Sequence, residues 1–194
     1  MEKNSTNSIT YDRERMLDYK IFSAGFSYPD DSFFKYFPNL SNQREKIIAE
    51  YDLLFRNKGL WLYTTEYTSK GTFQAAQHLC DIAGFYKAFG LNVDKDRPDS
   101  LGTEFEFMHF LIFKQIYAGE KKIKCYQEKV SLCLDVQGKF FSEYLYPGAK
   151  AIAEKILFQN RKSVYGDIAR EMLIFLEEEN KFFAKLSSPA QKVL

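Results

Sequence analysis

The chain has 194 residues, of which 45% are hydrophobic and 17% aromatic, a composition that buries one sizeable core and predicts a single domain. Its 27 Lys and Arg residues balance 26 Asp and Glu residues, and no basic cluster alternates with aromatic residues, which excludes nucleic acid as an expected partner. Only 10 Gly and 5 Pro residues interrupt the chain, which excludes a fold of many short strands and favours an all-α bundle.

The beginning of the chain and its cysteines predict the compartment. The first residues, MEKNSTNSIT, are polar and lack the apolar core of a secretory signal, and no run approaches the roughly 18 apolar residues of a membrane span. The three cysteines, Cys80, Cys125 and Cys133, form no Cys-x-x-Cys pair, so neither a disulfide framework nor a zinc site is supported. We therefore expect a cytoplasmic protein without membrane contact.

The domain is expected to span residues 11–186, between a disordered lead over residues 1–10 and a frayed tail over residues 187–194. Its first helix is predicted over about residues 12–26, where Met16, Tyr19 and Phe22 face inward.

After that helix the segment Tyr28-Pro29-Asp30-Asp31 predicts a break, followed by a short helix over residues 32–37. Another helix is expected from Ser41, as its N-cap, to about Phe55. The stretch 56–71 carries Trp61 and Tyr63 without helical periodicity, and it predicts an ordered surface loop. Such a loop is either functional or an aromatic lid that closes the core.

Residues 81–117 predict two helices with a charged connection between them. In the first helix Ile82, Tyr86 and Phe89 recur on one face, and Gly90 follows at the position of a C-terminal cap. The second helix opens at Pro98 and Asp99 and is apolar on nearly every side, which is typical of a central, buried helix.

The last third of the chain predicts three more helices. The first covers about residues 125–145 and is expected to end at Pro147 and Gly148. The others cover about residues 149–158 and 163–186.

Five segments carry the strongest functional pattern. They are EYDLLF at 50–55, GFYKAFGL at 84–91, PDSL at 98–101, EFEFM at 104–108 and CLDVQGKFFSE at 133–143. In this order they resemble the TorD/DmsD/NarJ family of redox-enzyme maturation chaperones, and the resemblance spans roughly residues 12–185. One departure is Ser100, which stands where many members of that family have His.

The resemblance implies a TorD-like helical bundle that acts as a non-catalytic chaperone without a cofactor or metal of its own. It also implies a partner, the catalytic subunit of a molybdopterin oxidoreductase, bound through its twin-arginine leader or in its apo form. The chaperone would assist cofactor insertion before export of that subunit.

A twin-arginine leader presents two arginines followed by an apolar stretch, so its receptor needs an apolar groove and accessible carboxylates. The candidates for the apolar wall are Leu54, Phe55, Trp61 and Tyr63. The candidates for the acidic rim are Asp52, Glu66, Asp94, Asp96, Asp99 and Glu104, with Asp99 and Glu104 in the family's most specific turn. Alternatively, Asp99 caps the helix that follows, and Glu104 and Glu106 satisfy buried donors.

Two other functions stay open at this point. Glu106 and His109 form one Glu-x-x-His pair, half of the motif that di-metal helical bundles use twice, so a single-metal or cofactor-dependent helical enzyme is the main alternative. A homodimeric scaffold is the other, with residues 92–99 as a hinge.

Overall fold

The structure, a computed structural model, describes the backbone of residues 2–92 and 97–187 and the side chains of residues 10–92 and 97–186. Within these ranges the chain is helical apart from its turns and one isolated bridge between Tyr63 and Ser100, which confirms the all-α fold. Two predicted acidic residues, Asp94 and Asp96, lie outside the described residues.

The first third of the chain departs from the prediction in two places. Its elements are α1 (Glu2–Gly25), α2 (Asp31–Tyr36), a 3-10 helix (Pro38–Gln43), α3 (Arg44–Tyr51) and a π-helical turn (Asp52–Asn57). Helix α1 takes in most of the stretch 1–10, where a disordered lead was expected. The predicted N-cap at Ser41 is wrong, because Pro38 opens a tight 3-10 helix that contains Ser41, and the α-helix begins only at Arg44.

The remaining elements are α4 (Thr65–Thr68), α5 (Thr72–Ala88), α6 (Leu101–Lys121), α7 (Tyr126–Phe140), a π-helical turn (Phe141–Leu145), α8 (Tyr146–Asn160) and α9 (Val164–Ser187). The predicted helix end at Pro147 and Gly148 is wrong. Pro147 lies in the first turn of α8, where its missing N–H needs no partner, directly after the π-helical turn that interrupts regular bonding.

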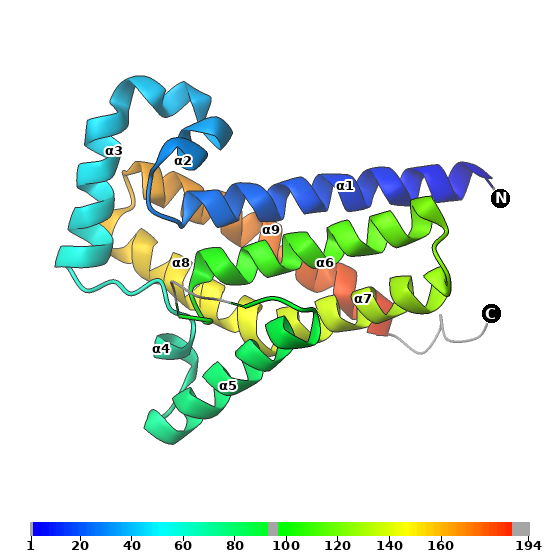
Figure 1. Ribbon diagram of the computed structural model, residues 1–194. Helices are drawn as coiled ribbons and strands as arrows, with labels where there is room; N and C mark the ends of the chain where they lie inside the picture. Colours follow the sequence, from blue (N-terminus) through cyan, green and yellow to red (C-terminus); the bar gives the residue numbers. More distant parts are fainter. Residues whose placement is uncertain (1, 93–96, 188–194) are drawn as a thin grey trace.

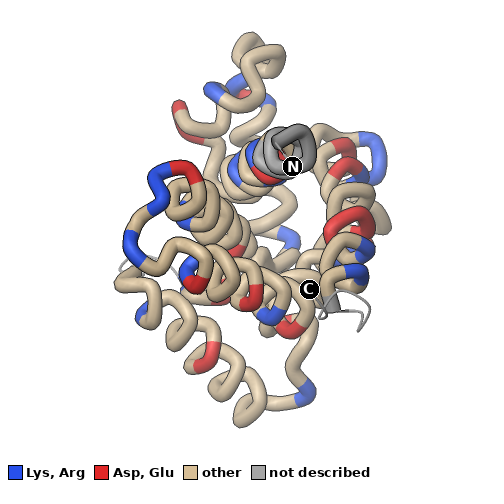
Figure 2. The backbone as a smooth tube through the Cα atoms, turned by 90° about the vertical axis from the view of Figure 1, so that its right-hand side faces the viewer, with Lys and Arg blue, Asp and Glu red and all other residues tan. Residues whose placement is uncertain are grey.

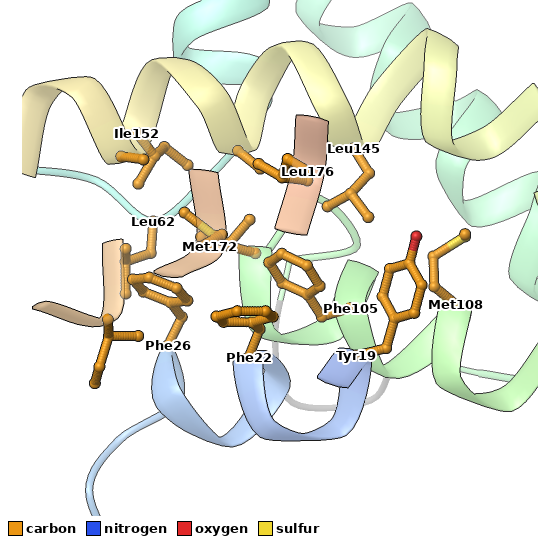
Figure 3. Packing of buried hydrophobic residues seen from close by; sticks show 14 of the residues in the cluster. Tyr19, Phe22, Phe26, Leu62, Phe105, Met108, Leu145, Ile152, Met172 and Leu176 are labelled. Atoms are coloured by element: carbon orange, nitrogen blue, oxygen red, sulfur yellow. The ribbon is translucent and has the colours of Figure 1, made fainter. Parts of the chain in front are cut away.

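Helix α6 is central, as its sequence predicts. It lies alongside α1 and packs on α7 as well, while α8 packs on α9 (Figure 1). Its residues Leu101, Phe105, Met108 and Leu111 are fully buried, and Figure 3 shows Phe105 and Met108 among side chains from α1, α8 and α9. One side of α6 remains open, because Phe113 is 47% exposed.

A buried polar network fastens the two ends of the chain to each other. Arg15 of α1 donates from Nε and Nη2 to the two oxygens of Glu179 in α9 at 2.6 and 2.7 Å, and both side chains are almost fully buried. The Tyr19 hydroxyl donates to the same carboxylate at 2.7 Å, and Arg15 also reaches Asp12 at 3.1 Å. Such a network is satisfied in only one register of the helices.

Helix α5 extends away from the bundle, with α4 beside its beginning (Figure 1). It is attached by aromatic contacts, since Tyr86 and Phe89 lie against Phe107, and Phe85 lies against Phe140. Its outer end is solvated, and Phe73 there is 86% exposed.

Lys and Arg alternate with Asp and Glu along the same helices (Figure 2). In the described ranges the chain has no helix that is both long and apolar enough to cross a membrane.

We predict that Gly148→Ala lowers the free energy of unfolding by about 1–3 kcal/mol, because a Cβ there would lie 2.4 Å from Cβ of Thr64. The matched control is Gly84→Ala in α5, where a new Cβ meets no atom within 4 Å and the helix gains up to about 1 kcal/mol. Urea denaturation of the two variants measures both effects, and equal stabilities would contradict the close approach at Gly148.

Candidate functional site

An open groove of about 450 Å³ lies between the end of α1, the π-helical turn after α3 and the loop that follows it. We call it the aromatic groove, and its lining residues are Phe26, Ser27, Tyr28, Tyr51, Phe55, Arg56, Trp61, Leu62, Tyr63 and Ser100. Three of the four residues predicted for the apolar wall, Phe55, Trp61 and Tyr63, meet here. The fourth, Leu54, is fully buried in the core and does not line the groove.

The surface of the groove is built from aromatic rings. Trp61 is half exposed and stacks on Tyr63, with ring centres 6.3 Å apart. Tyr51, which also lines the groove, makes edge contacts with Tyr28 and with Phe55, with ring centres 5.4 and 4.9 Å apart. Exposed Trp and Tyr supply large, rigid contact area for an apolar ligand.

Sequence reasoning named only three of the ten residues that line this groove, and the residues it missed include Tyr28, Tyr51 and Arg56. Tyr28 was read only as part of a helix break, and Tyr51 only as part of the segment EYDLLF. Arg56 was not considered, although its guanidinium lies 4.7 Å from the centre of the Tyr28 ring and pairs with the carboxylate of Asp52 at 2.9 Å. The four-residue spacing of Asp52 and Arg56 is the signal that predicts this ion pair.

Next to the groove, a cluster of carboxylates surrounds an arginine. Asp99 is fully buried and accepts hydrogen bonds from Nε and Nη2 of Arg97, each at 2.9 Å. The hydroxyl of Thr65 donates to the same carboxylate. Arg97 also donates from Nη1 to Glu66 at 2.8 Å, and its guanidinium lies 4.3 Å from the centre of the Tyr63 ring.

We call this arrangement of Asp99, Glu66, Thr65 and Tyr63 around Arg97 the arginine clamp. A planar guanidinium that meets a carboxylate through two parallel hydrogen bonds and lies on an aromatic face makes the strongest contacts open to it. Arg97 itself was not predicted, although the run Arg97-Pro98-Asp99 places a cation two residues from the acid.

Glu104 is fully buried at the beginning of α6, where its Oε1 accepts the Thr64 hydroxyl at 2.7 Å. Within the described part of the chain, its Oε2 has no hydrogen-bond partner. Burial raises the pKa of Glu104 well above its usual value; the charge of Asp99 adds to this effect, and the Thr64 hydrogen bond opposes it. The carboxyl is therefore favoured in its neutral form.

Backbone hydrogen bonds also join the loop to the residues at the start of α6. The Thr64 amide donates to the Asp99 carbonyl at 2.9 Å, and the Leu101 amide donates to the Leu62 carbonyl at 2.8 Å. The predicted cap by Asp99 is not made, since Ser100 occupies the N-cap position of α6 and makes no capping hydrogen bond through its side chain. The acidic residues thus hold the loop on α6.

Both residues of the Glu-x-x-His pair of the alternative function have partners in α1. Glu106 accepts from Nζ of Lys20 at 2.7 Å and from the Ser23 hydroxyl at 3.0 Å. Nδ1 of His109 lies 2.9 Å from the Met16 carbonyl oxygen. Across residues 10–92 and 97–186, no group of three or more His, Cys, Asp and Glu side chains could hold a metal ion.

The fold and this site define an all-helical bundle with an aromatic surface groove beside a buried carboxylate pair. The chain belongs to the nitrate reductase delta subunit family, whose model matches residues 25–153. This is a family of NarJ/TorD-type chaperones for molybdoenzyme maturation, and its members bind nitrate reductase-type molybdoenzyme subunits. Comparison with curated proteins gave no match, and comparison with solved structures gave none either.

We predict that Glu104→Gln is at least as stable as the parent protein at neutral pH. The folded-state pKa of Glu104 lies above the unfolded value of about 4.5, so the stability that its neutral form contributes is lost as pH rises through the folded value. A glutamine stays neutral, so the stability difference in favour of the variant should grow above about pH 4.5.

Melting temperatures of both proteins between pH 4 and pH 9 would measure this difference, where roughly 1 kcal/mol corresponds to about 2–4 °C for a chain of this size. Thr64→Val removes the hydroxyl that favours the charged form, so the loss of stability with rising pH should continue to a higher pH in this variant. A parent protein that gains on the variant as pH rises would contradict the assignment.

Proposed function

We propose that this chain is a cytoplasmic chaperone that binds the twin-arginine leader of a molybdopterin oxidoreductase subunit in the aromatic groove. The observation that carries the proposal is the position of Tyr63, which lines the groove and also lies under the guanidinium of the arginine clamp. One continuous surface therefore offers aromatic walls beside a site that suits arginine.

The two halves of a leader have matching partners on this surface. Its apolar stretch would lie against Trp61 and Tyr28, which are 50% and 41% exposed, and would remove them from water. Its arginines would lie toward Glu66, whose side chain is 44% exposed at the edge of the clamp. Family membership supports the class of client, because the family's chaperones serve molybdoenzyme subunits.

Holding a leader would keep the subunit in the cytoplasm while its body stays accessible for cofactor insertion. The apo form of the subunit is a second part of the same proposal, because the groove is open on one side and a larger surface can cover its rim. Whether the chaperone works as a homodimer stays a prediction, which light scattering of the purified protein tests.

We predict that Trp61→Ala weakens binding of a twin-arginine leader peptide about 10- to 100-fold, the loss typical of a central aromatic at an interface. Isothermal titration of leader peptides from the same genome measures the affinity. The matched control is Phe158→Ala on α8, because Phe158 is 91% exposed and lies outside the groove. It should bind as the parent protein does.

Peptides in which both arginines are replaced by lysines separate charge from geometry. They should bind more weakly, because an ammonium cannot make two parallel hydrogen bonds to one carboxylate. Absence of binding to every leader and every apo subunit, or equal losses in the Trp61 and Phe158 variants, would contradict the proposal.

A further inference from the structure

We propose that Arg97 is an internal occupant of a guanidinium-binding site, and that an arginine of a bound peptide takes its place. The site is formed by Asp99, Thr65, Glu66 and Tyr63. The first part of this inference stands on the contacts of Arg97 alone, and the second rests on the proposed function.

Asp99, at the base of the site, has hydrogen bonds that do not involve the Arg97 side chain. The Asp99 carbonyl accepts from the Thr64 amide at 2.9 Å, and the Asp99 carboxylate accepts from the Thr65 hydroxyl. Thr64 and Thr65 are themselves almost fully buried, and the Glu104 carboxyl holds Thr64 at 2.7 Å. The carboxylate thus keeps its position and orientation when its guanidinium partner changes.

The occupant differs from the walls in its access to water. The Arg97 side chain is 38% exposed, whereas that of Asp99 is 0% exposed. Arg97 can therefore turn into solvent without uncovering the core. Loss of the guanidinium alone would leave Asp99 as a buried charge without its ion-pair partner, which is costly. Exchange of one guanidinium for another avoids that cost, because the charge and the two parallel hydrogen bonds are replaced in kind.

The site also adjoins the aromatic groove, so an arginine bound there would position the rest of its peptide. Tyr63 carries the Arg97 guanidinium on its ring at 4.3 Å, lines the aromatic groove and stacks on Trp61. A peptide arginine that enters the clamp would place the residues that follow it beside the groove. Arg97 then acts as a competitor, so the observed affinity for a peptide reflects only the fraction of molecules whose site is open.

The first test uses Arg97→Ala and a small ligand, methylguanidinium, at millimolar concentration. The variant should melt at a lower temperature than the parent protein, and methylguanidinium should restore much of the difference in a saturable way. Methylammonium is the matched control, since it carries the same charge without the planar fork, and it should restore little. The parent protein, whose site is filled, should respond to neither cation.

The double variant Arg97→Ala, Asp99→Asn removes the carboxylate, so methylguanidinium should no longer raise its melting temperature. If the single variant does not fold alone, refolding in each cation asks the same question. Recovery of stability with methylguanidinium but not with methylammonium supports the site. Equal effects of the two cations, no effect of either, or rescue that persists in the double variant would overturn it.

The second test is calorimetric titration of a twin-arginine leader peptide. The Arg97→Ala variant should bind it at least about fivefold more tightly than the parent protein, and its lysine counterpart should show no such gain. A gain of equal size for both peptides, or no gain, would overturn the competition.

The outcomes also separate the guanidinium site from the proposed function. Rescue by methylguanidinium with no leader bound by either protein leaves the guanidinium site standing and removes the proposed function. Leader binding in the groove, without rescue and without tighter binding by the variant, leaves the proposed function standing and removes the guanidinium site.

Discussion

The removal of two neighbouring carboxyl groups from water is the constraint on which the site depends. Asp99 and Glu104 are both fully buried at the beginning of α6, and two buried negative charges this close would repel each other. The protein resolves this by different means for each group. Asp99 stays paired with Arg97, whereas Glu104 is favoured as a neutral acid beside Thr64.

This arrangement fixes the loop that carries the groove. Thr64 and Thr65 are hydrogen-bonded to the buried acids, and Trp61 and Tyr63 precede them by only a few residues. These buried hydrogen bonds, the anchor of the loop, therefore fix the position of the exposed rings. Gly148 completes the anchor, since only a residue without Cβ lets α8 come this close to Thr64. Rigid support behind an exposed aromatic surface reduces the ordering cost of binding.

Much of this fold could be predicted from the sequence, because periodicity reports directly on burial. The apolar spacing of α6 predicted a central helix, and Gly90, in a left-handed conformation, ends the helical region of α5 as expected. The failures at Ser41 and Pro147 have a common cause. Local preferences for caps and breaks were overridden by 3-10 and π-helical turns, which depend on packing with distant segments.

The site was less predictable than the fold. Residue type identified Phe55, Trp61 and Tyr63, which do line one groove. Trp61 and Tyr63 stood out as aromatic residues in a stretch without helical periodicity, and Phe55 as the last apolar residue of the helix before it. The same reasoning left two roles open for Asp99 and Glu104, as an accessible acidic rim or as a helix cap and an acceptor for buried donors. Both acids are buried, and each is bonded to a specific partner. Arg97 is only two residues from Asp99, whereas Thr64 is 40 positions from Glu104 and meets it only through the folded loop.

The contact between Arg15 and Glu179 has a consequence for the order of events during synthesis. The two residues are 164 positions apart, so Arg15 lacks its principal partner until the ribosome has made about two thirds of α9, which spans Val164–Ser187. Contacts of such long sequence separation close late and slowly. On the nascent chain, the part of the bundle that holds these two residues therefore stays unpacked. Helix α1 can pack on α6 first, and it gains its contacts with α9 last.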